Sequence, residues 1–192
     1  MRHVGRKGHP LSTAVLFLTA LAALSLMTAA AAAGTGSAAP PARSISPQDA
    51  VTLDTVMKTF YGSLTFPEGK GPDWVRYKSL FLSASAPLVR TTPGNELVTT
   101  LEGFDANLNG RIQSGVIKAF YEAEVARTTE TFGRLALVFS TYEKGLNTTD
   151  PAKLIRGVNS LQLVQRDGRW WIVSVTWEDE TPGNPLPAKY VK

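Results

Sequence analysis

Apolar side chains recur at helical spacing at the start of the main body of the chain. They are separated by steps of three and four residues, which predicts one apolar stripe along a helix. Ser46 is a good N-cap, Pro47 suits the first helical position and Asp49 suits the first turn, so we expect this helix to begin near residue 47. The stripe consists of Leu53, Val56, Met57, Phe60, Tyr61 and Leu64.

Two further helices are predicted before residue 111. A break rich in proline and glycine precedes residues 73–82, where Trp74, Tyr77 and Phe81 share a helical face. We expect a brief strand at 87–90, followed by a turn at TTPGN. The third helix is predicted to close at Gly110. Its apolar positions are Leu97, Leu101, Phe104 and Leu108.

The pattern changes from residue 116 onward. Branched and aromatic residues form runs at 114–129, 132–144, 155–166 and 169–179, with turn residues between them. Asp167-Gly168 is a strong signal for a two-residue hairpin. We therefore predict an α+β domain, in which a curved antiparallel sheet of about four main strands wraps around three N-terminal helices.

The first 45 residues have a different character. A basic segment ending at Pro10 precedes an uncharged run over residues 11–33, which predicts a signal peptide over 1–33. Cleavage as late as Ala39 and an uncleaved membrane anchor are the alternatives. We expect a flexible linker at 34–45, a domain at 46–180 and an extended proline-rich tail at 181–192, with export to the periplasm or the medium.

Composition narrows the chemistry of the domain. The net charge of +4 comes mostly from the leader, since no acidic residue precedes Asp49 and 17 basic and 16 acidic side chains remain without Arg2, Arg6 and Lys7. We therefore expect no nucleic acid partner. The chain has no cysteine, which excludes disulfides and thiolate metal sites. Its two histidines lie at positions 3 and 9, so a mature domain has no imidazole for a catalytic triad.

Three segments together resemble a known family. DWVRYKSLF at 73–81, FGRLALVFSTYE at 132–143 and RGVNSLQLVQRDGRWWIVSVTW at 156–177 are similar to the SnoaL-like branch of the nuclear transport factor 2 superfamily. The resemblance covers about residues 47–180. It implies a cone-shaped fold with an internal pocket and frequent dimerisation through the sheet. The family contains enzymes as well as non-catalytic binding proteins and scaffolds, and its catalytic members generally use Asp, His, Tyr and Arg sets.

Because the domain lacks histidine, we expect it to bind a small, partly apolar molecule without catalysis. A lyase or isomerase that uses a pocket carboxylate is one alternative, and a structural dimer module without ligand is another. We expect the domain to form a homodimer, with no cofactor and no membrane contact beyond the leader. Residues 105–112 match the start of a calcium loop, but the twelfth position is Val116 instead of glutamate, so we expect no metal there.

Candidate site residues follow from strand parity and from the aromatic content. Glu122 and Glu124 leave the same face of a strand; they are a pair of acid–base groups if that face is concave, and solvated partners of Arg127 or Arg134 if it is convex. Trp170 and Trp171 are the dimer-face candidates, because adjacent residues point to opposite faces. The ligand-binding candidates are Tyr61, Trp74, Glu122, Glu124, Ser140, Tyr142, Asn159 and Trp177.

Overall fold

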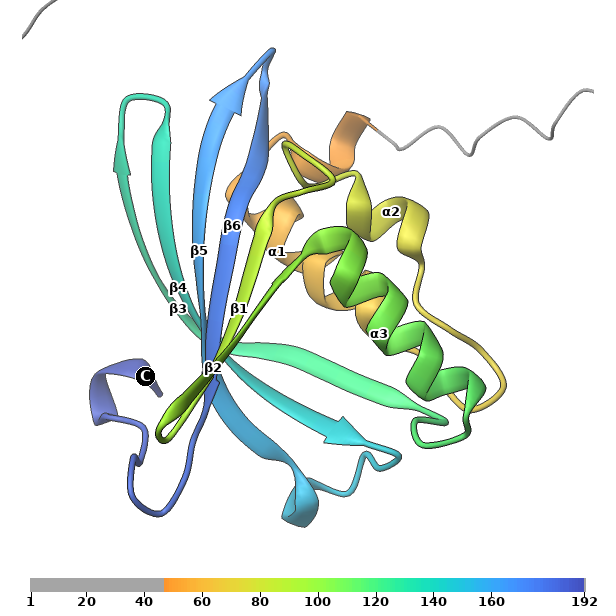
Figure 1. Cartoon of the computed structure of the whole chain (residues 1–192). Coiled ribbons are helices and arrows are strands. Elements are labelled where there is room, and N and C mark those ends of the chain that lie inside the picture. The colour runs from red at the N-terminus through yellow and green to blue at the C-terminus, as the bar shows by residue number, and fades with distance from the viewer. Residues whose placement is uncertain (1–46, 192) are drawn as a thin grey trace, which may run out of the picture. The chain divides into compact units, whose positions relative to one another are not determined.

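Helices and a six-stranded sheet make up the domain in the computed structural model, which describes residues 47–191. The helices lie on one face of the curved sheet (Figure 1). The predicted signal peptide and linker lie outside the described residues. The elements are η1 (Pro47–Ala50), α1 (Leu53–Leu64), α2 (Trp74–Lys78), β1 (Pro87–Thr92), β2 (Asn95–Thr100), α3 (Leu101–Gln113), β3 (Phe120–Phe132), β4 (Leu135–Leu146), η2 (Pro151–Lys153), β5 (Ile155–Arg166), β6 (Arg169–Asp179) and η3 (Ala188–Tyr190).

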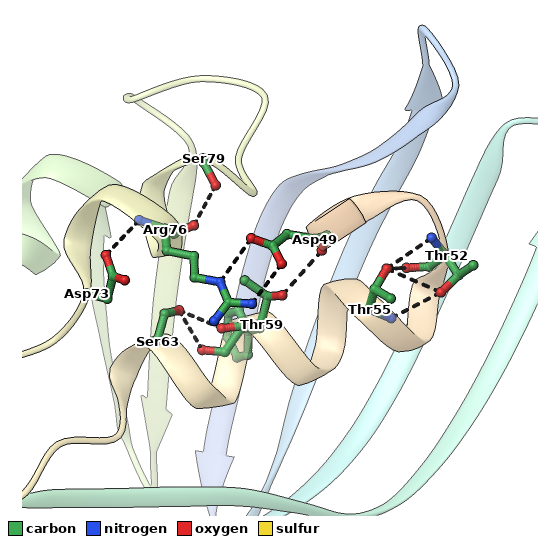
Figure 2. Close-up of polar contacts among 9 residues, drawn as sticks. Asp49, Thr52, Thr55, Thr59, Ser63, Asp73, Arg76 and Ser79 are labelled. Atoms are coloured by element: carbon green, nitrogen blue, oxygen red, sulfur yellow. Dashed lines mark hydrogen bonds and ion pairs between the residues drawn. The ribbon is translucent and has the colours of Figure 1, made fainter. Parts of the chain in front are cut away.

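The first helix begins later than predicted. Residues 47–50 form the 3-10 turn η1, and α1 starts at Leu53 behind a capping box made by Thr52 and Thr55. Asp49 does not serve the first turn of α1. Its carboxylate accepts two hydrogen bonds from the Arg76 guanidinium, at 2.7 and 3.0 Å, and so ties η1 to α2 (Figure 2).

The second and third helices also differ from the prediction. Helix α2 has five residues and ends at Lys78. Leu97 belongs to strand β2 and is 59% exposed, because Gly94 with φ of 83° turns the chain back into a hairpin with β1. Helix α3 starts only after its N-cap, Thr100, and it passes through Gly110 to Gln113. The calcium-loop motif is therefore helical, which leaves its oxygen atoms without the geometry of a loop site.

The sheet has six strands rather than about four, in the order β2-β1-β6-β5-β4-β3. The four long strands form the predicted antiparallel meander, and Asp167 and Gly168 both take positive φ in the tight turn between β5 and β6. Strand β1 pairs in parallel with β6, which makes the sheet mixed. A pattern of apolar residues cannot reveal this pairing, because the two strands are far apart in the sequence.

Two β-bulges control which side chains face the helices. Val125 in β3 and Val173 in β6 have no partner in the register of the neighbouring strand. Each extra residue reverses the alternation, so that the inward side chains fall on even positions before Val173 and on odd positions after it. The buried Ile172 and the buried Val175 consequently face the same side of the sheet.

The hydrophobic core fills the space between the sheet and the helices. Within residues 47–191, 23 buried apolar residues form one cluster, to which α1 contributes Val56, Met57, Phe60, Tyr61 and Leu64. Trp170 is inside this region and only 9% exposed, so it is not available as a dimer contact as proposed from the sequence. Trp171 is only partly buried and its ring stacks under the Arg169 guanidinium at 4.0 Å.

The C-terminal segment follows the outer face of the sheet. The tail predicted to be extended includes the short helix η3, and the Tyr190 ring stacks on Phe139 with centroids 5.5 Å apart. Thr141 donates a hydrogen bond to the Tyr190 carbonyl at 2.5 Å and is 1% exposed. Within residues 47–191, no helix combines the length and the apolar character needed to cross a bilayer.

Candidate functional site

A cavity of about 370 Å³ lies against the inner face of the sheet. Helices α1, α2 and α3 and all six strands contribute to its wall. The volume equals about a dozen water-sized volumes, which matches a small ligand. Most lining side chains are apolar: Phe60, Leu64, Tyr77, Leu88, Leu97, Val98, Phe104, Leu108, Ile117, Phe120, Leu146, Ile155, Val175 and Trp177.

Most polar lining residues lie on the sheet, and Asn107 and Arg111 lie on α3. Residues paired across neighbouring strands share a face, so the register brings together side chains that are far apart in the sequence. Glu122 pairs with Lys144, Asn159 pairs with Trp177, and Trp177 pairs with Arg90. Asp179 lies one inward position beyond Trp177 on β6. The cavity thus has an apolar body and one charged wall.

Gly157 leaves room for one hydrogen bond between side chains of the neighbouring strands. Gly157 pairs with Tyr142 on one side and with Asp179 on the other. Without a side chain at Gly157, the Tyr142 hydroxyl reaches across β5 and donates to the Asp179 carboxylate at 2.5 Å. A Cβ atom at position 157 would lie 2.3 Å from that hydroxyl. The glycine is therefore required by close packing, and its φ is not in the left-handed region.

Asp179 is the acceptor for three donors. Besides Tyr142, it accepts from Lys144 Nζ at 2.5 Å and from Arg90 Nη2 at 3.0 Å. Burial alone raises the pKa of Asp179, but the positive charge and hydrogen bond of Lys144, the Tyr142 hydroxyl and the Arg90 charge together lower it. Asp179 is thus held ionised, and its charge offsets only one of the two cations.

A second polar network starts at Glu122. Asn159 Nδ2 donates to Glu122 Oε1 at 3.4 Å and to the Tyr61 hydroxyl at 3.2 Å. Ser140 donates its single hydrogen to Glu124 at 2.6 Å, so Tyr61 must be the donor in its 2.6 Å contact with Ser140. The hydrogen bonds therefore have one direction, from Asn159 through Tyr61 and Ser140 to Glu124.

The two glutamates have different environments although both face inward. Burial raises the pKa of Glu122 to about 7, and the charge of Asp179 adds to this effect, while Lys144 and the Asn159 hydrogen bond oppose it. Glu124 lies outside the cavity and 3.7 Å from Arg127 Nε. Burial also raises the pKa of Tyr61, so its hydroxyl stays protonated at neutral pH. Glu122 is the carboxyl group suited to proton exchange.

The eight ligand-binding candidates from the sequence occupy three kinds of position. Glu122, Asn159 and Trp177 line the cavity. Trp74 does not, since its indole nitrogen donates to Asn109 at 2.9 Å and its ring packs on Phe104. The other four candidates do not line the cavity either. Tyr61 and Tyr142 form hydrogen bonds to the lining residues Asn159 and Asp179. Ser140 and Glu124 lie one step further away, since Ser140 bonds to Tyr61 and to Glu124.

Sequence reasoning missed four charged residues of the lining: Arg90, Arg111, Lys144 and Asp179. Two of them carried a usable signal. Lys144 has the same parity as Ser140 and Tyr142, and Asp179 has the same parity as Trp177. In the described residues, no group of three or more carboxylate or imidazole side chains is arranged to hold a metal ion.

Comparison with known proteins gives structural neighbours only. No family profile matches the chain, and no curated protein matches it. The neighbours include proteins described as NTF-2-like and one described as having a cystatin-like fold. An NTF-2-like protein from Silicibacter pomeroyi is 20% identical and covers 67% of this chain and 92% of its own length, with a TM-score of 0.46.

Two further neighbours have similar descriptions. A protein with a cystatin-like fold from Nostoc punctiforme is 13% identical over 67% of this chain and 88% of its own, with a TM-score of 0.47. An NTF-2-like protein from Shewanella oneidensis is 16% identical over 56% and 84%, with a TM-score of 0.42. All three are described as having unknown function.

Proposed function

We propose that the domain binds a small, partly apolar molecule in the cavity. One observation carries this proposal: a space of about 370 Å³ has an apolar body and a charged wall at one side. Ligand sites of soluble proteins combine a mostly apolar lining with a few placed polar groups in this way. The apolar part of a ligand would contact side chains such as Leu108 and Val175, and its polar group would face Glu122, Asn159 and Lys144.

A titration with 1-decanol tests this proposal, because that alcohol is uncharged and has about as many non-hydrogen atoms as the cavity can hold. We expect saturable binding of one molecule per domain by isothermal titration calorimetry. Leu108→Trp should weaken it, since Leu108 lines the cavity and the larger ring occupies part of the space. Leu137→Trp is the matched control, because Leu137 does not line the cavity and is 39% exposed. Equal binding by both variants contradicts the proposal.

A second candidate function is proton transfer by a lyase or isomerase. Glu122 supports it, because a carboxyl group with a pKa near 7 inside an apolar cavity is half ionised at neutral pH and can act as a general base. Asn159 holds the carboxyl group by a hydrogen bond, and Tyr61 in turn holds the Asn159 amide. These contacts fix the position from which a proton would be taken.

Deuterium exchange tests the second candidate without knowledge of the natural substrate. The domain is mixed with 2-decanone in D2O, and NMR follows the replacement of hydrogen next to the carbonyl. We expect exchange above the buffer rate with the wild-type protein and none with Glu122→Gln. Exchange that persists in Glu122→Gln rules out Glu122 as the base, whereas binding of 1-decanol without any exchange favours the binding function.

A further inference from the structure

The charged wall of the cavity contains more donors than acceptors. Lys144 is mostly buried, with 13% of its side chain exposed, and its ammonium group has three hydrogens to donate. Among the described residues, Asp179 is its only hydrogen-bond partner. Arg90 donates through one terminal nitrogen to Asp179, and its Nε is buried and has no partner within residues 47–191. Buried donors without acceptors are unfavourable.

The cavity lining also contains more positively charged than negatively charged side chains. Apart from tyrosine, five ionisable side chains line the cavity. Three are cations, Arg90, Arg111 and Lys144, and two are acids, Glu122 and Asp179. Below about pH 7, Glu122 is mostly protonated because burial raises its pKa, and Asp179 then provides the one negative charge of the lining. Glu122 and Lys144 are paired in the register, but they form no ion pair within 4 Å. The lining of the cavity therefore has an excess of positive charge.

The apolar residues of the lining continue from this wall to the open side of the cavity. Leu97 and Val98 on β2, Leu146 at the end of β4 and Ile155 at the start of β5 all line it and are 42–65% exposed. Ile155 pairs with Lys144 across the sheet, so the exposed apolar residues begin directly beside the cation. A ligand with its charged end at Lys144 can place its apolar chain along this lining.

We propose that the ligand is an organic anion with a single apolar chain of about ten carbons, bound with its carboxylate or similar oxyanion on Lys144 and Arg90. This proposal rests on the proposed binding function and names the class of ligand. An oxyanion accepts several hydrogen bonds at once, so it satisfies both the free Lys144 hydrogens and the Arg90 Nε hydrogen. It also balances the positive charge that Asp179 leaves uncompensated.

The test compares three compounds with the same chain and different head groups: decanoate, 1-decanol and decylammonium. Affinities are measured by isothermal titration calorimetry at about pH 6, where decanoate is ionised. We expect decanoate to bind at least about tenfold more tightly than 1-decanol, which is what one charged hydrogen bond provides, and decylammonium to bind most weakly. Equal or tighter binding of 1-decanol overturns the anion proposal and leaves the binding function intact. No binding of any compound refutes both.

Substitutions of Lys144 and Arg90 test whether these side chains cause the preference for decanoate over 1-decanol. Lys144→Met should remove most of the preference for decanoate over 1-decanol, and Arg90→Gln should reduce it by a smaller factor. Lys153→Met is the matched control, since Lys153 does not line the cavity and 70% of its side chain is exposed. A preference that is unchanged in both Lys144→Met and Arg90→Gln overturns the proposal. If Lys144→Met does not fold, Arg90→Gln alone decides, because Arg90 is 43% exposed and tolerates replacement.

Discussion

Replacing Glu122 with glutamine should make the domain more stable at alkaline pH. An ordinary glutamate has a pKa of 4.5, and burial raises that of Glu122 to about 7. Between these values, the unfolded chain is ionised while the native domain holds the proton, so native stability falls as the pH rises and levels off above about pH 7. At about 1.4 kcal/mol for each tenfold difference in proton affinity, the loss is about 3 kcal/mol. Glutamine stays neutral at every pH, so the variant does not lose this unfolding free energy.

Urea unfolding followed by circular dichroism measures this effect. The difference in unfolding free energy between Glu122→Gln and the wild-type protein should grow by about 2–3 kcal/mol from about pH 5 to about pH 8. The carboxylates of Asp49 and Asp179, whose pKa values are lowered by their cationic partners, affect both proteins equally at low pH. Glu130→Gln, at an exposed position of β3, should run parallel to the wild-type protein. Parallel profiles for Glu122→Gln would show that Glu122 titrates normally.

Three further predictions concern the same region. Gly157→Ala should destabilise the domain by about 2–3 kcal/mol in urea unfolding, because the new methyl group overlaps the Tyr142 hydroxyl. Its control is Gly62→Ala in helix α1, where an added Cβ has no neighbour within 4 Å. That substitution should stabilise the domain by about 0.5–1 kcal/mol. Asn159→Leu removes a hydrogen bond that lowers the pKa of Glu122, so carboxyl NMR should find that pKa above 7, and a fall would contradict the assigned contact. Deleting Val173 should leave ligand binding intact by calorimetry, because Ile172 and Ser174 then follow each other in a regular ladder and Val175 still faces inward; loss of binding would show that the bulge itself shapes the cavity.

The sequence predicted the elements that depend on local patterns. The meander was recognised because long apolar runs and the Asp167-Gly168 turn are local signals, and β5 and β6 begin and end where predicted. Leu97 misled the helix prediction, because a strand residue happened to fall four positions before the true first residue of α3. The capping residue Thr100 marks the real start, which a search for N-caps would have found.

The candidate site was predictable only in part. Their spacing of two residues placed Glu122 and Glu124 on one face of the strand. The bulge at Val125 then brings Arg127 to the same face as the two glutamates, although regular alternation would put it on the opposite face. A bulge has no sequence signal apart from an interrupted alternation. Arg90 joins the cavity through the parallel pairing of β1 with β6, which depends on the tertiary fold. Charged residues such as Lys144 and Asp179 are usually on the surface, so composition alone directs attention away from them.

The bulge at Val173 divides β6 into two segments with different structural roles. Before it, Trp170 and Ile172 belong to the buried core, and after it, Trp177 and Asp179 belong to the cavity wall. Inward positions in the two segments are set independently, since the extra residue absorbs the change of alternation. Substitutions that reshape the wall can therefore accumulate on one side of Val173 without repacking the core on the other. Strand β6 can therefore change the groups that face a ligand while the packing of its first half stays the same.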